Sequence, residues 1–270
     1  MTLKPAPRLR VITARDVTPA EVPGHSFRVL ADAQSTSGRY SLTVATSPPA
    51  AAVPPHVHHR AVECFYVMEG EYRLTVSGHI HEARAGQFVL VPRGAAHQFR
   101  VAGDQPGRAV VIFSPAGFEH VFRMMPEIFG TPGEPGPLWA RLNADHDTDL
   151  LDDGRPAAGG PAAGGPAAIT AGSPARRQHL PTRQNLALPE HTRTGLAIRH
   201  LQHPRNAAWD LASATSAVWI LAGSYRFETP DAETTAGAGQ LVTFTGAVAR
   251  GAGLTHHNEA LVLSYSTERA

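Results

Sequence analysis

Four polar side chains in the first half of the chain have the types and spacing of metal ligands. His56 and His58 lie two residues apart, so on a strand they point to the same face. Glu63 follows in the next strand-like segment, and His97 follows a Pro-Arg-Gly turn that redirects the chain. Three neutral imidazoles and one carboxylate suit Fe(II), Mn(II), Ni(II), Co(II) or Zn(II). We expect one such divalent ion to bind these four side chains.

The chemistry expected of such an ion follows from its open positions. Four protein ligands on an octahedral ion leave two neighbouring sites, where a substrate oxygen and O₂, or a bidentate substrate, can meet. The ion lowers the pKa of a bound hydroxyl, and Glu63 is the expected catalytic base. Alternation from Glu63 and His97 sends Phe65, Val67 and Phe99 to the same interior, where they would form an apolar substrate pocket. Such a pocket suits a flat aromatic or polyketide-like ligand better than a sugar phosphate.

The elements that must position these residues are short strands. Alternating or β-branched runs separated by Gly and Pro turns predict an all-β sandwich or barrel. One helix is expected over 117–125, where apolar residues recur at helical spacing. The expected strands are Tyr40–Ala45, Glu63–Met68, Tyr72–Val76, Gln87–Val91, Ala109–Phe113, Gly195–Leu201, Ala217–Leu221, Tyr225–Glu228, Gln240–Phe244 and Leu261–Tyr265.

The two halves of the chain match each other. A shift of 153 residues places FYVMEGEYRL (65–74) on VWILAGSYRF (218–227), and AGQFVLV (85–91) on AGQLVTF (238–244). Two segments in one register indicate an internal duplication, and therefore two barrels. None of the four candidate ligands is preserved in the second half, where they fall on Trp209, Leu211, Ser216 and Arg250. We expect the second barrel to be degenerate and free of metal.

A segment of low complexity separates the two halves. Residues 152–177 repeat a PAAGG unit and lack large apolar side chains, which predicts a flexible linker. The expected organisation is a metal-binding barrel over 1–150, the linker over 151–178 and a degenerate barrel over 179–270. Two roles stay open for the second barrel. It walls off the first pocket, or it widens a dimerisation surface and makes the protein a homodimer.

Charge and composition exclude several classes of partner. The chain has 24 Lys and Arg against 23 Asp and Glu, which favours neither nucleic acid nor an acidic membrane surface. A single cysteine, Cys64, excludes an internal disulfide framework and fits a reducing compartment. No N-terminal apolar stretch resembles a signal peptide, and no run approaches the roughly 18 apolar residues of a membrane span. We expect a cytoplasmic protein.

The two segments that carry the candidate ligands resemble a known family. HVHHRAVECFYVMEG (56–70) and GQFVLVPRGAAH (86–97) follow the two-part signature of the cupins, which are jelly-roll β-barrels. Ala50 stands where the signature has a glycine and Val101 where it has an asparagine, and neither position is a ligand. The resemblance is strong over roughly residues 25–125 and extends further only through the internal repeat. Within the superfamily, the chain looks most like the bacterial quercetin 2,3-dioxygenase-like group.

The resemblance implies two tandem cupin barrels and three classes of function. The first is a dioxygenase that uses O₂ on a flavonol or another enolisable substrate, with Fe(II) as the first expected metal. The second is a redox-neutral isomerase, cyclase or decarboxylase in which the metal only polarises a carbonyl. The third is a non-catalytic barrel that binds a small molecule. The fold hosts all three, and oxygen consumption separates the first from the second.

Overall fold

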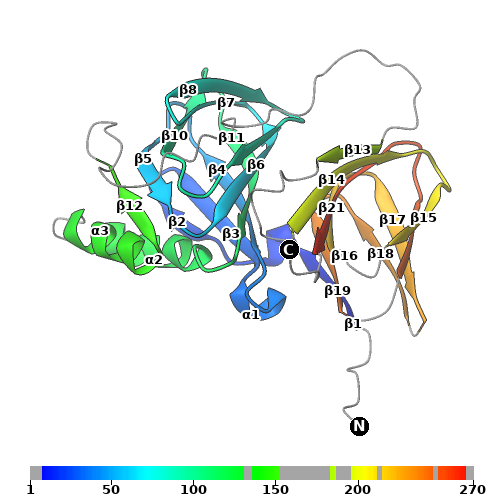
Figure 1. The fold of residues 1–270 in the computed structure, drawn as a ribbon. Coiled ribbons are helices and arrows are strands. Elements are labelled where there is room, and N and C mark those ends of the chain that lie inside the picture. Colours follow the sequence, from blue (N-terminus) through cyan, green and yellow to red (C-terminus); the bar gives the residue numbers. More distant parts are fainter. Residues whose placement is uncertain are drawn as a thin grey trace, which may run out of the picture. The chain divides into compact units, whose positions relative to one another are not determined.

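A computed structural model of the chain describes residues 8–130, 136–151, 183–186, 196–211, 215–230, 232–245 and 249–265. The described residues fall into two compact units, one within Thr18–Ala175 and the other within Met1–Val17 and Arg176–Ala270. Each unit contains two antiparallel sheets (Figure 1). The all-β prediction with two barrels is therefore confirmed.

The N-terminal unit is built from a five-stranded and a six-stranded sheet. The strand order is β12-β5-β10-β7-β8 in the first sheet and β2-β3-β4-β11-β6-β9 in the second. The strands are β2 (Ala20–Val22), β3 (His25–Ala31), β4 (Ser41–Ser47), β5 (Ala52–His58), β6 (Val62–Glu69), β7 (Glu71–Val76), β8 (His79–Arg84), β9 (Phe88–Val91), β10 (His97–Ala102), β11 (Gly107–Ser114) and β12 (Thr148–Leu150). The helices are α1 (Ala33–Thr36), α2 (Glu119–Gly130) and α3 (Gly136–Asp145).

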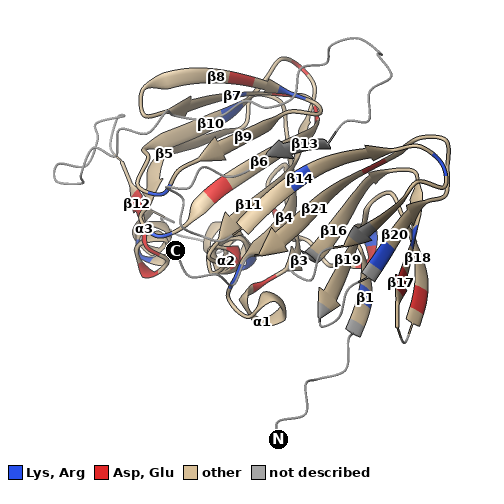
Figure 2. Cartoon of the chain, turned by 45° about the vertical axis from the view of Figure 1, so that its right-hand side comes forward, with Lys and Arg blue, Asp and Glu red and all other residues tan. Residues whose placement is uncertain are grey.

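Alternation explains how these strands form the barrel. In β7, Tyr72, Leu74 and Val76 are buried while Glu71 and Arg73 are exposed, so only one face turns inward. The exposed side of the β7–β8 hairpin carries ion pairs such as Arg73–Glu82, at 3.0 Å, and Figure 2 shows bands of both charge signs in this unit. By contrast, β6 is buried from Val62 to Val67, on both of its faces. The strand that carries Glu63 is therefore held from two sides.

A glycine turn recurs at equivalent places in the two halves. Gly70 and Gly223 have φ angles of 78° and 75°, in the left-handed region. A Cβ on Gly70 would lie 2.6 Å from the carbonyl oxygen of Pro106, and a Cβ on Gly223 would likewise meet the carbonyl oxygen of His257. Both turns require glycine for the same two reasons, which fits a duplicated barrel.

The C-terminal unit is built from a six-stranded and a four-stranded sheet. Their orders are β1-β19-β16-β21-β14-β13 and β15-β20-β17-β18. The strands are β1 (Arg8–Thr13), β13 (Arg183–Leu186), β14 (Leu196–His203), β15 (Ala208–Leu211), β16 (Thr215–Ala222), β17 (Ser224–Thr229), β18 (Ala232–Gly237), β19 (Gln240–Thr245), β20 (Ala249–Gly253) and β21 (Asn258–Tyr265). Its core includes Tyr225, Phe227, Val218, Val242 and Val262.

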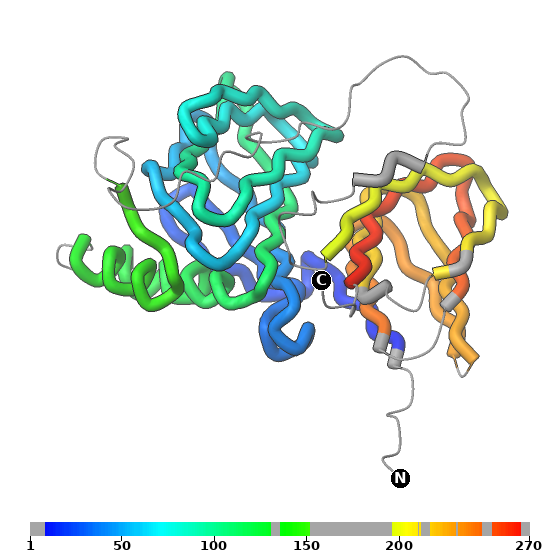
Figure 3. Tube along the Cα trace, in the orientation of Figure 1, coloured from blue at the N-terminus to red at the C-terminus, as the bar shows by residue number. Residues whose placement is uncertain are grey.

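The first strand of the chain belongs to the second barrel. β1 pairs with β19 through six register partners, from Arg8 opposite Thr245 to Thr13 opposite Gln240, and the blue strand lies beside the orange one in Figure 3. The boundary expected at residues 1–150 therefore differs from the structure at its N-terminal end, because these six residues complete the edge of the other sheet. The predicted linker at 151–178 lies outside the described residues, apart from Leu151.

The helices differ from the expected one over 117–125. The helix α2 begins at Glu119, because Gly117 has a φ of 139° that a helical residue cannot adopt. The Glu119 carboxylate accepts the backbone N–H groups of Gly117 and Ala33, at 2.6 and 2.7 Å. The helix continues to Gly130, and the sequence analysis missed α3. No helix among the described residues is long and apolar enough to cross a membrane.

Candidate metal centre

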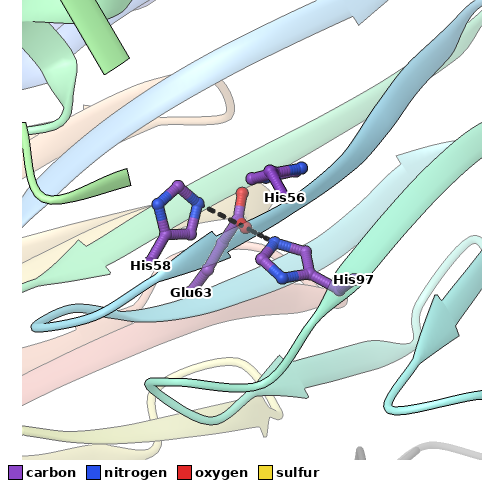
Figure 4. Close-up of side chains that lie close together, drawn as sticks. All are labelled: His56, His58, Glu63 and His97. Carbon is purple, nitrogen blue, oxygen red and sulfur yellow. Dashed lines mark hydrogen bonds and ion pairs between the residues drawn. The ribbon is translucent and has the colours of Figure 1, made fainter. Parts of the chain in front are cut away.

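Three strands from the two sheets of the N-terminal barrel bring the predicted ligands together (Figure 4). His56 and His58 lie on β5, and His97 begins β10, directly opposite His56 in the antiparallel pair. Glu63 comes from β6 in the other sheet. A one-residue register shift would turn each side chain to the opposite face, so the pairing of these strands fixes the cluster.

The four side chains form a compact, buried group. Their candidate ligand atoms all lie within 4.8 Å of one another, and each residue is at most 5% exposed. The nearest carboxylate oxygen, Glu63 Oε2, is 2.8 Å from His97 Nε2 and 3.4 Å from His58 Nε2. The His56 and His97 ring centroids are 4.1 Å apart. The described residues contain no other cluster of three or more His, Cys, Asp or Glu side chains arranged to hold a metal.

Backbone carbonyls orient two of the three imidazoles. His56 Nδ1 donates to the carbonyl oxygen of Pro54 at 2.8 Å, and His97 Nδ1 donates to that of Ala95 at 2.9 Å. Because Nδ1 of each ring carries the hydrogen of this bond, only Nε2 of each ring is left to face a metal. His97 Nε2 lies 2.8 Å from Glu63 Oε2, and a metal ion bound by these two atoms would take the place of this hydrogen bond.

A residue that the sequence analysis missed orients the third imidazole. His58 Nδ1 lies 2.8 Å from the hydroxyl oxygen of Thr148, which stands opposite His58 in the β5–β12 pair. The two residues are 90 positions apart in the sequence. A lone threonine after a helix carries no pattern by which the sequence could have revealed this contact.

Burial dominates the electrostatics of the site. Burial is the largest cause of the lowering of the His56 pKa to about 3, and the neighbouring His97 and His58 act in the same direction. Burial likewise lowers the pKa of His58. For Glu63, burial alone would raise the pKa, but its polar contacts with His58 and His97 outweigh this and lower the pKa well below its usual range. The cluster therefore favours neutral imidazoles at His56 and His58 and an ionised carboxylate, which are the forms that bind metals.

One atom in the cluster supports metal binding directly. His58 Nε2 is buried, and its only polar contact among the described residues, with Glu63 Oε2 at 3.4 Å, does not have hydrogen-bond geometry. An unpartnered buried nitrogen costs free energy, and a metal ion would satisfy it. The donor set of three imidazole nitrogens and one carboxylate oxygen also fits a divalent transition metal. The residues present therefore fit the expected ion.

The predicted pocket residues belong to the apolar interior of the barrel, and two phenylalanine rings contact His58. Phe65 and Val67 belong to the core of the barrel, and Phe99 packs against that core while half-buried. The Phe65 and Phe99 rings have centroids 5.3 Å apart, edge to face. Phe118, just before α2, packs edge-on against the His58 ring, with ring centroids 4.6 Å apart, so the start of the segment expected as a helix contacts a candidate ligand.

Strand register refines the comparison with the second barrel. In the first barrel Leu74 pairs with Phe99, whereas its counterpart Phe227 pairs with Gly251. For the residues of β20, the offset between the two halves is therefore one residue less than the 153 residues that align the other segments. His97 corresponds by register to Ala249 rather than to Arg250.

The same register shift changes the counterpart of His56. Leu211 pairs with Ala249 in the second barrel, as His56 pairs with His97 in the first. Leu211 therefore replaces Trp209 as the counterpart of His56. Because the side chains of leucine and alanine cannot bind a metal, the second barrel has no ligand at the positions of His56 and His97.

Comparisons with known proteins agree with this geometry. A family model described as "Cupin domain" matches residues 43–113, which include all four clustered side chains. "Polyketide synthase CurC" of Streptomyces cyaneus is 30% identical over 111 residues, covering 40% of this chain and 71% of that protein. Quercetin 2,3-dioxygenase of Bacillus subtilis (strain 168) is 26% identical over 98 residues, covering 36% of this chain and 29% of that protein.

The fold likeness extends to both barrels. Oxalate decarboxylase of Bacillus subtilis superposes on 100% of this chain and 78% of its own, with a TM-score of 0.62 and 13% sequence identity. This identity shows the fold alone, in which two jelly-roll barrels follow each other. With the family model and the Streptomyces relative, it shows that the chain is a two-barrel member of the cupin superfamily.

Proposed function

We propose that this protein is a metal-dependent oxygenase that acts with O₂ on a small aromatic or enolisable substrate, such as a flavonol or a polyketide-like compound. The observation that carries the proposal is the convergence of three imidazoles and one carboxylate inside an apolar barrel. Fe(II) is the metal we propose, and Mn(II), Ni(II), Co(II) and Zn(II) share the same ligand preference.

The protein's own residues would divide the work as follows. His56, His58, His97 and Glu63 would hold the metal, which would supply Lewis acidity and the means to activate O₂. Glu63 would accept the proton of a substrate hydroxyl at a carboxylate oxygen, because it is the one carboxylate of the cluster. Burial of the four side chains would keep bulk water away from the reacting atoms.

The apolar wall supports a substrate of the proposed class. Phe65, Val67 and Phe99 would contact the flat face of a ring or an enolised diketone, and the aromatic pair would favour edge or offset contacts. Phe118, which already packs on His58, would limit the room beside this ligand. Few polar groups would then anchor the substrate apart from the metal itself.

The relatives support two versions of the chemistry. The likeness to a protein named quercetin 2,3-dioxygenase favours the oxygenase. The likeness to a protein named a polyketide synthase covers a larger share of that relative and favours an enolisable polyketide-like substrate. On such a substrate a redox-neutral isomerase, cyclase or decarboxylase is the second candidate function.

Oxygen uptake tests the proposal. The protein is purified without added metal, its metal content is measured, and it is reloaded with Fe(II) under anaerobic conditions. We expect O₂ consumption equal to the substrate lost with at least one member of a panel of flavonols and β-diketones. Substrate loss without O₂ consumption would move the assignment to the redox-neutral class. A metal-loaded protein that transforms no compound of either type would contradict both.

A further inference from the structure

The short strand β12 extends the barrel beyond the residues that match the cupin family. Its first residue, Thr148, pairs with His58, and the backbone N–H of His59 donates to the carbonyl oxygen of Asp147 at 2.9 Å. On the exposed side, the His59 ring is 2.8 Å from the Asp149 carboxylate. The matched family segment ends at residue 113, so this strand lies outside it and pairs directly with the strand that carries two candidate ligands.

The buried side chain of this strand makes a relay of two hydrogen bonds. Thr148 is 1% exposed. Its hydroxyl donates to the carbonyl oxygen of His146 at 3.2 Å, and the same oxygen lies 2.8 Å from His58 Nδ1. Because the hydroxyl hydrogen is directed to His146, the oxygen presents a lone pair to His58. The matching hydrogen must therefore lie on Nδ1 of the ring.

The opposite direction of the hydrogen bond between Thr148 and His58 would leave fewer polar groups with a partner. If the Thr148 hydroxyl donated to Nδ1 instead, the carbonyl of His146 would lose this hydrogen bond. The ring proton would move to Nε2, 3.4 Å from Glu63 Oε2, a contact without hydrogen-bond geometry. That proton would also stand between the nitrogen and a metal. The relay thus selects the ring form that can bind.

We propose that Thr148 is a positioning residue of the metal centre, which holds His58 with its proton on Nδ1 and its free nitrogen toward the metal. The inference rests on the metal-binding part of the proposed function and is independent of the reaction. Loss of an outer partner of this kind typically weakens metal binding about 10- to 100-fold.

Three variants of the full-length protein test the role. Thr148→Val removes the hydroxyl and keeps the shape, whereas Thr148→Ser keeps the hydroxyl. Asp149→Asn is the matched control, because it changes an exposed partner on the same strand. Competition with a chelator measures the affinity for Co²⁺ and for Zn²⁺. We expect Thr148→Val to bind both about 10- to 100-fold more weakly, and the other two variants to bind as the unaltered protein does.

Nitrogen NMR of the histidine rings gives a readout that needs no variant. In the metal-free protein we expect His58 to carry its proton on Nδ1, and in Thr148→Val to shift it toward Nε2. A proton on Nε2 of His58 in the unaltered protein would overturn the inference even if Thr148→Val failed to fold. Unchanged affinity in Thr148→Val, or an equal loss in Thr148→Ser, would overturn it as well. Failure of the unaltered protein to bind either ion would instead contradict the proposed function.

Discussion

Replacing Glu63 by glutamine separates its two proposed roles, as ligand and as base. The side chain is 4% exposed, and its Oε2 lies 2.8 Å from His97 Nε2. Glutamine keeps the shape and an oxygen donor but removes the negative charge from the four-residue cluster. Three imidazoles remain, so we expect binding to weaken without disappearing. We take a loss of about a hundredfold, or about 2.7 kcal/mol, as the expected size.

The consequence for thermal stability follows from mass action. With free metal at 100 times the dissociation constant, binding stabilises the unaltered protein by about 2.7 kcal/mol. After a hundredfold weakening, the same metal concentration stabilises Glu63→Gln by about 0.4 kcal/mol and fills about half of the sites. For a unit of this size, 1 kcal/mol corresponds to about 2–4 °C. The metal-induced rise in Tm should therefore fall from roughly 5–11 °C to about 1–2 °C.

Calorimetry with and without metal, together with elemental analysis, measures this change. The matched controls are His58→Ala, which should lose metal and activity together, and His59→Ala, whose side chain is 47% exposed and should change neither. At saturating metal, turnover of Glu63→Gln should fall about 10²- to 10⁴-fold if Glu63 is the base. Full occupancy together with full turnover would refute both roles, and the site would then act by Lewis-acid polarisation.

Four further predictions concern the rest of the molecule. The full-length protein should bind one metal ion per chain, and the double variant His58→Ala, His97→Ala should bind none. Metal found in the double variant by elemental analysis would reveal a second site. Because the pKa of His56 is lowered from 6.5 to about 3, the folded metal-free protein binds fewer protons than the unfolded chain between these values. Its free energy of unfolding should therefore rise with pH between about 3 and 6.5 and level off above that range. Urea unfolding at several pH values measures this, and a free energy of unfolding that does not change with pH would contradict the prediction. Phe65→Ala should lower the free energy of unfolding, measured in urea, by about 3–5 kcal/mol, because Phe65 is only 2% exposed. A smaller loss would mean that the neighbouring side chains move in to fill the cavity. Deleting residues 8–13 should lower the Tm of the C-terminal unit and leave the metal stoichiometry unchanged, whereas loss of the metal would show that the two are coupled.

Local patterns made the strands and the ligand cluster predictable. His56 and His58 share a face because side chains alternate along a strand, and the turn before His97 fixes where the next strand begins. The ten expected strands match ten of the observed ones and differ from them only at their ends, where pairing with neighbours decides the last residue. The strands β5 and β10, which carry the three histidines, were not among the expected ranges. The roles of Phe65, Val67 and Phe99 in substrate binding stay predictions, as do the homodimer and the cytoplasmic location.

Long-range pairing explains what the sequence could not show. The segment Arg8–Thr13 reads as an ordinary strand, and nothing within it indicates that its partner is β19. The one-residue change of register in β20 is equally invisible, because the matching segments that established the offset lie in other strands. In both cases a strand signal is local, but the choice of partner depends on which sheet edge is left to be covered.

The pairing of β12 with β5 shows how the choice of a partner strand affects the metal centre. A barrel that ended at the family's matched segment would contain all four candidate ligands, yet His58 would lack the acceptor that Thr148 provides. In a water-excluded site, a ring N–H without a partner costs free energy, and the ring would be free to exchange its two proton positions. Pairing β12 with β5 places the Thr148 hydroxyl against Nδ1 of His58 and removes that freedom before any metal arrives. The affinity of the centre should therefore depend on a segment that the ligand motif does not include, and the Thr148 variants measure that dependence directly.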